Sequence, residues 1–394
     1  MKSSLLAAAL LVIPSLAFAG DARPAQRSRP AEKFTDGQKA FDKAMKELLE
    51  KYVDEGVSAD DLWRGATQGM LEHAGERPWD TLLSPTDLEE MMGSLGGEIV
   101  GIGVEIKFDE DTGVTMVRGV LPGSAAEKAG MMKGDQILRI DGKSYKGRDL
   151  REVVNAIRGK AGAEVSITFL HEDKVLTKSL RREKLVVQTV TDTVLPGEVG
   201  LLTIGSFSEK TPELVKAALE RLKSAHITGL VVDLRSCPGG LFEKAVATGE
   251  LFLPKGKTFV TTVHRGGDEE PIVTKNDPVL TVPLAVLVNE QTASGAEILA
   301  GALQESGNAR VVGRKTMGKW NVQIIDDLPN HYAIKFTVGS FKTPKGESLD
   351  GQGLIPDLEV EMDPALVEKS RRMSDVRERL VLDAQLRVAA ASVR

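Results

Sequence analysis

A strand–helix–strand pattern limits most strongly how this chain can fold. The apolar runs at residues 283–288 and 311–313 are each typical of a buried strand, and an apolar-periodic helix between them begins after residues 292–297, Thr-Ala-Ser-Gly-Ala-Glu. Two earlier strand patterns, at residues 199–204 and 229–233, are each followed by a helical pattern. Alternating strands and helices predict an α/β layer.

Ser294 stands at the start of the later helix, where two roles are open. As an N-cap, its hydroxyl would accept a backbone N–H, and Glu297 three residues later would complete a capping box. As a nucleophile at a strand-to-helix turn, its oxygen would be exposed at a helix N-terminus, which favours developing negative charge. The local pattern alone does not decide between the two.

Lys319 and Gln323 favour the nucleophile. A lysine acts as a general base only when it is neutral, and burial favours the neutral form. If residues 319–323 are extended, both side chains point to the same face, where Gln323 would orient the amine without adding charge. A Ser–Lys pair is a known variant of the nucleophile–base arrangement. Ser294, Lys319 and Gln323 are therefore the candidate catalytic residues.

The sequence around these residues resembles the carboxyl-terminal processing peptidases, the tail-specific proteases of serine peptidase family S41. Residues 292–298 read TASGAEI and residues 316–323 read TMGKWNVQ, where that family typically has SASASEI and TFGKGxVQ. The resemblance implies that Ser294 is the nucleophile, Lys319 the base and Gln323 the residue that positions it. It also implies a serine protease core of the ClpP/crotonase-like α/β type that uses no cofactor.

Two glycine motifs extend the resemblance along the chain. Residues 233–240, DLRSCPGG, match a family motif, and residues 351–357, GQGLIPD, match the family's closing motif. By itself, the Pro-Gly-Gly turn is also typical of a strand-to-helix connection that needs a positive φ. The resemblance implies that Gly239 or Gly240 joins the N–H of Gly295 in an oxyanion hole, and which of the two glycines does so stays open.

Residues 98–184 differ in character and resemble a PDZ domain of the α+β class. The match is carried by residues 122–130, PGSAAEKAG, and residues 134–142, GDQILRIDG. PDZ domains bind extended C-terminal peptides by adding a strand to a sheet edge, and backbone N–H groups take the free carboxylate. The resemblance implies a carboxylate loop and an apolar peptide pocket. Their residues would be Gly101, Ile102, Gly103, Val104, Val153, Val154 and Ile157.

The N-terminus has the pattern of a secretory signal peptide. Lys2 precedes an apolar run, and Ala-Phe-Ala at residues 17–19 forms a small-residue cleavage site, so we expect a signal peptide over residues 1–19. An uncleaved anchor is the alternative, but the apolar run is short for a spanning helix. We therefore expect export to a bacterial periplasm, with no membrane span after cleavage.

Composition narrows the classes of function. The net charge of −6, without a sustained basic patch, argues against nucleic acid as a partner. Cys237 is the single cysteine, so an internal disulfide is excluded, and we expect a small side chain in a turn rather than a catalytic thiol. The five histidines show no metal-ligand spacing, so no metal site is predicted.

The 394 residues leave room for two or three domains, and helical patterns flank the PDZ-like and protease-like regions. The expected parts are a signal peptide (1–19), a flexible leader (20–33), an N-terminal helical segment (34–97), a PDZ domain (98–184), a protease core (185–362) and a C-terminal helical tail (363–394). We expect the tail to be one helix over residues 366–388. In the N-terminal segment one apolar helix face would cover a core or, alternatively, contact a second copy or an adaptor. That face consists of Phe41, Met45, Leu48, Leu49 and Tyr52.

Together these features predict an exported serine endopeptidase that recognises apolar or disordered C-termini of protein substrates through its PDZ domain and cleaves through an acyl-enzyme. Whether it needs an adaptor or activator protein, or forms a homo-oligomer, stays open. The main alternative is a catalytically inactive PDZ scaffold, because Trp320 replaces a family glycine beside the base.

A trypsin-like Ser-His-Asp protease is a further alternative, although the chain contains no Gly-x-Ser-Gly-Gly motif. The two kinds of base predict different pH dependence. A lysine base predicts activity that rises well above about pH 7, whereas a histidine base predicts a rise at roughly pH 6–7.

Overall fold

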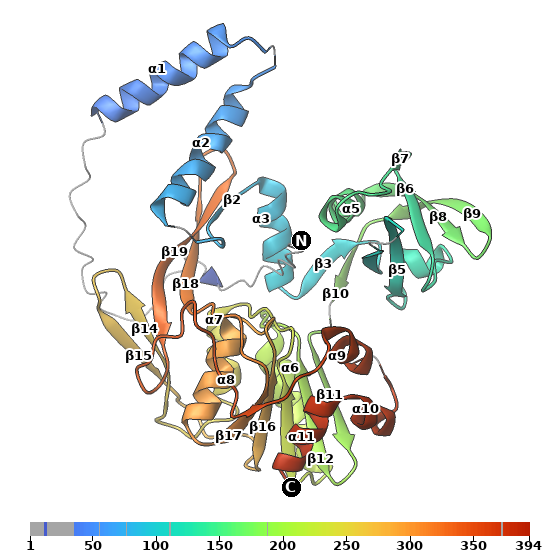
Figure 1. Cartoon of the computed structure of the whole chain (residues 1–394), viewed down its shortest axis with the longest axis vertical. Helices are drawn as coiled ribbons and strands as arrows, with labels where there is room; N and C mark the ends of the chain where they lie inside the picture. The colour runs from blue at the N-terminus through green and yellow to red at the C-terminus, as the bar shows by residue number, and fades with distance from the viewer. Residues whose placement is uncertain are drawn as a thin grey trace.

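The computed structural model describes residues 12–13, 35–54, 56–75, 77–109, 112–186, 188–371 and 373–394. Figure 1 shows three parts: a group of N-terminal helices, a small strand-rich domain beside it, and a larger domain that contains the C-terminus. The expected multi-domain α/β architecture is confirmed. The expected signal peptide and leader lie outside the described residues, apart from the two-residue strand β1 (Val12–Ile13).

A six-stranded sheet forms the centre of the large domain. In spatial order its strands are β11 (Val190–Leu195), β12 (Val199–Ile204), β13 (Gly229–Asp233), β16 (Leu284–Val288), β17 (Ala309–Gly313) and β20 (Leu358–Glu359). Only β11 is antiparallel to its neighbour. Parallel neighbours need crossover connections, which are supplied by helices α6 (Thr211–Ser224) and α8 (Gly295–Glu305). The predicted strand–helix repeats are therefore present.

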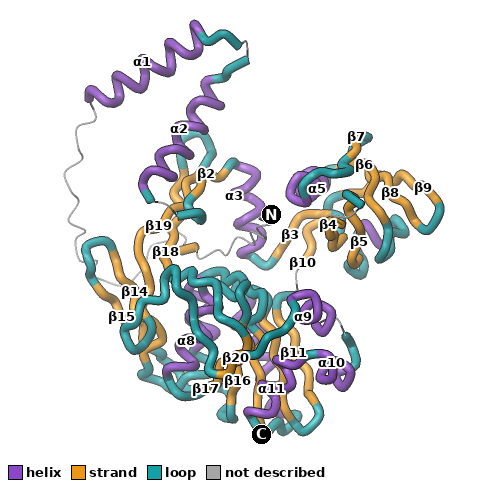
Figure 2. Tube along the Cα trace, viewed as in Figure 1, coloured by secondary structure: helices purple, strands orange, loops and turns teal. Residues whose placement is uncertain are grey.

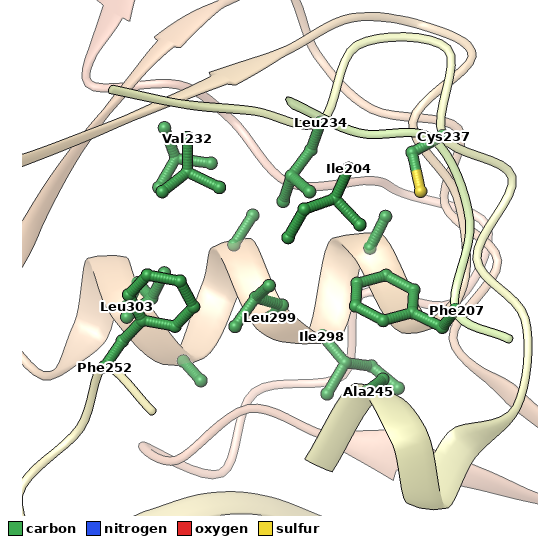
Figure 3. Close-up of a cluster of buried hydrophobic side chains, with 14 of the residues drawn as sticks. Ile204, Phe207, Val232, Leu234, Cys237, Ala245, Phe252, Ile298, Leu299 and Leu303 are labelled. Atoms are coloured by element: carbon green, nitrogen blue, oxygen red, sulfur yellow. The ribbon is translucent and has the colours of Figure 1, made fainter. Parts of the chain in front are cut away.

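Helices cover both faces of this sheet. On one face, α6, α7 (Phe242–Gly249) and α8 pack against the strands; Figure 3 shows Ile298, Leu299 and Leu303 of α8 among these contacts. On the other face the strands pack against α11 (Ala384–Ser392). Strands buried on both faces read as continuous apolar runs, and every residue of β13 and β16 is buried.

The C-terminal tail forms three helices, so the expected single helix over residues 366–388 is wrong. They are α9 (Pro364–Arg371), α10 (Val376–Leu382) and α11. Asp375 caps α10 and Asp383 caps α11, each accepting backbone N–H groups of the helix that follows. A capping aspartate starts a new helix, so these two residues divide the pattern. Helix α11 completes the layer structure of the large domain.

A second sheet joins the N-terminal helices to the large domain. Its strands are β14 (Thr258–His264), β15 (Glu269–Val273), β18 (Asn321–Asp327), β19 (Ala333–Lys342), β2 (Thr81–Leu83) and β1. Strand β2 pairs with β19, and β1 runs parallel to β18 opposite Gln323 and Ile324. Residues before the small domain are thereby held against the strand that follows Lys319.

The N-terminal helices are α1 (Thr35–Lys51), α2 (Ala59–Ala74) and α3 (Pro85–Leu95). Ser58 caps α2, since its Oγ accepts the N–H of Asp61 at 3.0 Å. Helix α1 projects away from the other described parts of the chain (Figure 1), so its apolar face covers no core among the described residues, contrary to our first expectation. Four residues of that face are 39–54% exposed: Phe41, Leu48, Leu49 and Tyr52.

The small domain consists mainly of strands, with helix α5 (Leu150–Ile157) beside them (Figure 2). Its elements are β4 (Val104–Asp109), β5 (Val114–Val120), α4 (Ala125–Lys128), β6 (Gln136–Ile140), β7 (Lys143–Ser144), α5, β8 (Glu164–His171) and β9 (Lys174–Arg181). An antiparallel pair, β3 (Glu98–Gly101) and β10 (Glu183–Val186), connects it to the other parts. Across the described residues, no helix combines the length and apolarity needed to cross a bilayer.

Candidate active site

Ser294 lies at the turn between β16 and α8 in a strained backbone conformation. Its φ of 57° and ψ of −123° fall in a region that residues other than glycine rarely adopt. The side chain is buried, and its Oγ makes no hydrogen bond to any described residue. Strain of this kind persists only where the surroundings hold it, and it is concentrated at functional sites.

Glu297 connects Ser294 to the segment that carries Lys319. Its Oε2 accepts the backbone N–H groups of Ser294 and Lys319, both at 2.8 Å. Its Oε1 accepts the N–H of Gly318 at 2.7 Å and the hydroxyl of Thr316 at 2.5 Å. Burial raises the pKa of Glu297, although these hydrogen bonds act to lower it. Only the glutamate half of the expected capping box is therefore formed, and the Ser294 hydroxyl does not cap the helix.

Lys319 is buried just before β18, with only 1% of its surface exposed. Burial and the nearby charge of Lys335 lower the pKa of Lys319 to about 7, against the opposite effects of Asp80 and Glu297. A large fraction of the amine is therefore neutral at neutral pH, as a general base requires. The pKa is lower than the sequence suggested, so pH dependence alone would not separate this lysine from a histidine base.

Gln323 lies on β18, also buried. Its Nε2 donates to the carbonyl of Trp79 at 3.1 Å and to Asp80 Oδ1 at 3.0 Å. Its Oε1 has no hydrogen-bond partner among the described residues. The amide is therefore anchored through its nitrogen and keeps an acceptor oxygen available inside the protein.

The two candidate oxyanion glycines have different surroundings. A Cβ on Gly239, whose φ is +93°, would lie 2.8 Å from the Ser294 Cβ and 2.9 Å from the Gly295 nitrogen. A Cβ on Gly240 would instead lie 2.2 Å from the carbonyl oxygen of Phe207. The N–H of Gly295 is the first of α8 and has no acceptor within the helix. The structure thus brings Gly239 and Gly295 to Ser294, while Gly240 packs against a neighbouring loop.

Four residues behind the alternative functions are Trp320, Cys237, His264 and His331. The Trp320 ring is buried in the hydrophobic core, 3.0 Å from the position of a Cβ on Gly301. Cys237 is fully buried, and burial raises its pKa to about 12, which keeps the thiol protonated. His264 and His331, which a Ser-His-Asp protease would need, are both exposed.

The residues expected to form the PDZ peptide site lie in two segments, one from the end of β3 to the start of β4 and the other in α5. Gly103 has a φ of +86°, and a Cβ there would lie 2.2 Å from the Ser124 Cβ, so only glycine fits. Ile102, Val153 and Ile157 are buried together in the core of this domain. The other four lie in the same two segments: Gly101 is buried, Val104 and Val154 are half-buried, and Gly103 is buried.

Sequence reasoning missed an ion cluster that fixes the Gly239 loop. Arg235 is fully buried and binds Asp233 at 2.7 Å and Asp383 at 2.9 Å, and its Nη1 also donates to Gln385 at 3.1 Å. The loop that carries Gly239 is thereby tied to the start of α11. The motif that contains Arg235 was visible in the sequence, but its partners in the tail were not.

The Trp79–Asp80 contacts with Gln323 and Lys319 were also missed. The Trp79 ring centroid lies 5.0 Å from Lys319 Nζ. These two residues carry no motif, and Asp80 is separated from Gln323 by 243 positions. No local signal in the sequence points to this contact.

Comparisons with known proteins agree with this geometry. Residues 198–360 match Peptidase family S41, and residues 116–170 match the PDZ domain. The carboxy-terminal processing protease CtpA of Bacillus subtilis (strain 168) is 32% identical over 332 residues, covering 84% of this chain and 69% of that protein. A CtpA-like serine protease of Staphylococcus aureus (strain bovine RF122 / ET3-1) is 34% identical over 307 residues, covering 77% of this chain and 61% of that protein.

A solved structure is also similar over nearly the whole chain. The photosystem II D1 C-terminal processing protease superimposes with a TM-score of 0.54 and 27% sequence identity, covering 91% of this chain and 100% of that one. The chain spans less than two thirds of the staphylococcal relative but more than two thirds of the Bacillus protein. It belongs to peptidase family S41, the serine-type carboxy-terminal processing proteases, and carries a PDZ domain.

Proposed function

We propose that this chain is an exported endopeptidase with a Ser294–Lys319 dyad, which cleaves proteins through an acyl-enzyme. The observation that carries the proposal is the shared carboxylate oxygen of Glu297, which accepts the N–H groups of both residues at 2.8 Å. It holds the backbones of the two residues close to each other. The Ser294 hydroxyl does not cap its helix, and the pKa of the Lys319 amine is about 7. These are the two properties that a nucleophile–base pair requires.

The proposed reaction begins when neutral Lys319 takes the proton of the Ser294 hydroxyl as its oxygen attacks a peptide carbonyl. The oxyanion then lies between the N–H of Gly295 and an N–H of the Gly239–Gly240 turn. Lys319 returns the proton to the leaving amine, and the acyl-enzyme remains. Lys319 next takes a proton from a water molecule as the water attacks the ester, and it returns that proton to the Ser294 oxygen as the carboxylic acid product leaves. Gln323 orients the amine through its acceptor oxygen.

We propose that the PDZ domain recognises substrates by their C-termini. PDZ domains take a free carboxylate with backbone N–H groups and pair the peptide with a sheet edge. The printed name of the Bacillus relative, a carboxy-terminal processing protease, supports substrates of this kind. An apolar or disordered C-terminus would fit an apolar pocket and would thread easily into a cleavage site.

The N-terminal pattern, the small domain and Trp320 bear on where the protein acts, how it is controlled and whether it is active. The signal-peptide pattern supports export to a periplasm, where an adaptor or a second copy would find the exposed apolar face of α1. The PDZ domain would gate the site, since Arg118 of β5 pairs with Glu368 of α9 at 3.2 Å. The main argument for an inactive scaffold was that Trp320 would disturb the site beside the base. The Trp320 ring instead packs into the core, which removes this argument.

Cleavage of an unfolded reporter protein by the purified chain tests the dyad. Ser294→Ala and Lys319→Ala should each reduce kcat by about four to six orders of magnitude, because the two residues act as a unit. Lys315→Ala is the matched control, since Lys315 is an exposed lysine four residues before Lys319 and should leave cleavage unchanged. Activity that survives in either dyad variant would place the catalytic site elsewhere.

A further inference from the structure

We propose that Asp80 and Trp79, from the N-terminal helical segment, are positioning residues that hold and tune the base formed by Lys319 and Gln323. The inference deepens the proposed function and rests on Lys319 acting as the base. Both residues precede β2, outside the segment that matches the S41 family. The N-terminal helical segment, which lies outside the family match, would therefore contribute residues to the active site.

The first step concerns the orientation of the Gln323 amide. An amide nitrogen carries two donor hydrogens, and its oxygen is an acceptor. Nε2 faces two acceptors, the carbonyl of Trp79 and Asp80 Oδ1, so the reversed amide would place an oxygen against both of them. Oε1 therefore points elsewhere, and it is buried without a hydrogen-bond partner among the described residues.

A buried acceptor without a partner is costly, so it calls for a functional explanation. The Gln323 oxygen can accept a hydrogen from the Lys319 amine during the reaction. Such a bond would direct the nitrogen lone pair of the amine toward the Ser294 proton. Asp80 and the Trp79 carbonyl thus act on the base through Gln323.

The second step concerns how Asp80 itself is held. Its Oδ1 also accepts the hydroxyl of Thr337 on β19 at 2.8 Å. The next residues form β2, which pairs with β19 in a register that places Thr81 opposite Lys335. On the other side, Arg77 binds Asp350 at 3.2 Å. The segment is therefore fixed at both ends, and Asp80 has little freedom to leave Gln323.

Asp350 in turn connects this segment to the residues that follow the base. Its Oδ1 accepts the N–H of Trp320 and the side-chain amide of Asn321, both at 3.3 Å. The backbone next to Lys319 is therefore held by the same carboxylate that binds Arg77.

The third step concerns the charges that face Lys319. They are Asp80 before β2, Lys335 on β19 and Glu297 on α8. Burial and Lys335 lower the pKa of Lys319, whereas Asp80 and Glu297 raise it. The oxygens of Glu297 are occupied by four other donors, as described above. Asp80 is the remaining carboxylate, and it keeps the amine from becoming too weak a base.

The Trp79 ring adds a second influence on the same amine. An aromatic face attracts an ammonium group within about 6 Å of its centroid, and the observed distance is 5.0 Å. The ring is half-buried and also limits access of water to the amine. A phenyl ring would preserve the aromatic face, whereas an aliphatic side chain would not.

An NMR titration of labelled lysine side chains in the full chain tests these roles without requiring catalysis. The parent carries Ser294→Ala, and the Lys319 signal is identified by its loss in Lys319→Ala. Asp80→Asn should lower the titration midpoint of Lys319 by about one pH unit, because a neighbouring negative charge is removed. Lys335→Gln should shift it in the opposite direction. Trp79→Leu should lower it slightly, and Trp79→Phe should restore it.

The second measurement is the pH profile of kcat/KM in proteins that retain Ser294. Its rising limb should move down in Asp80→Asn and up in Lys335→Gln. Asp80→Ala should lower kcat by about tenfold or more with a smaller change in KM, because the base loses its orientation. Asp80→Asn keeps an acceptor for Gln323 and should recover part of that loss.

Each failure has a distinct meaning. If the Lys319 midpoints of Asp80→Asn and Lys335→Gln coincide with that of the parent, the inference is wrong, even if both variants are less active. A merely structural role would lower activity without moving the midpoints in opposite directions. If Ser294→Ala still cleaves the reporter, the proposed function fails instead, and the titration can still be read.

Discussion

Lys319 and Arg235 are two buried basic side chains of the same domain with opposite charge behaviour. Arg235 is 0% exposed and binds Asp233 and Asp383 at 2.7–3.0 Å. Burial acts to lower its pKa, but the two carboxylates outweigh this effect and the pKa is raised. Lys319 is 1% exposed, and there burial prevails and the pKa falls to about 7.

The difference lies in what the neighbouring carboxylates bind. Asp233 and Asp383 direct both oxygens at the guanidinium of Arg235, which matches a planar, bidentate arrangement. Glu297, beside Lys319, uses its oxygens for three backbone N–H groups and one hydroxyl. Burial between two carboxylates that each bind the guanidinium through both oxygens gives a fixed structural charge. Burial beside a carboxylate that binds other donors gives an amine that can lose its proton.

The largest effect on stability is expected at the arginine cluster. Asp383→Ala would leave part of a buried charge uncompensated, so the free energy of unfolding should fall by about 3–5 kcal/mol. Asp383 also caps α11, and Asp375→Ala supplies the matched control because Asp375 caps α10 at an exposed position. That control should cost only about 1 kcal/mol.

Urea denaturation of the two variants measures the difference directly. If Asp383→Ala lowered the free energy of unfolding no more than Asp375→Ala does, Asp383 would contribute only as a helix cap and not as a partner of Arg235. The contrast between the two buried bases would then disappear.

A smaller effect, dependent on pH, is expected at Lys319. Its folded-state pKa of about 7 lies below the ordinary value of 10.5, so the unfolded chain binds more protons between these limits. The stability of the wild type should therefore rise with pH in that window, by up to about 1.4 kcal/mol per pH unit. Lys319→Met does not bind this proton. The free energy of unfolding of the variant relative to the wild type should therefore be greatest below pH 7 and decrease as the pH rises.

Unfolding measured at several pH values between about 6 and 9 checks this slope. A constant difference in unfolding free energy between Lys319→Met and the wild type across that range would contradict the lowered pKa. Arg235→Met in the same series should instead stay strongly destabilised at every pH, because its carboxylate partners remain buried.

Much of the large domain could be predicted because its signals are local. The apolar runs at residues 199–204 and 229–233 predicted β12 and β13 with the observed bounds. The motifs around Ser294 and Lys319 pointed to residues that Glu297 indeed ties together. Periodicity and short motifs report on neighbours in sequence, and these elements depend mainly on such neighbours.

The remaining features depend on contacts that local patterns do not record. Asp80 meets Gln323 across 243 positions, and the pairing follows from how β2 joins β19. Arg235 meets Asp383 across 148 positions. The apolar face of α1 could be read from the sequence. The spacing of its apolar residues could not show whether another part of the chain packs against that face. The breaks in the tail were readable, since aspartates at positions 375 and 383 are typical helix starts.

The central claim is that buried Lys319 is the general base at neutral pH. The most direct test is the pH dependence of kcat/KM for reporter cleavage by the wild type and Lys319→Ala. With Lys319 as the base, the wild-type rate should rise with the loss of one proton near pH 7, and the variant should show very low activity without this rise. If Lys319→Ala kept a rising limb with the same midpoint, the proton would be accepted by another group and Lys319 would not be the base.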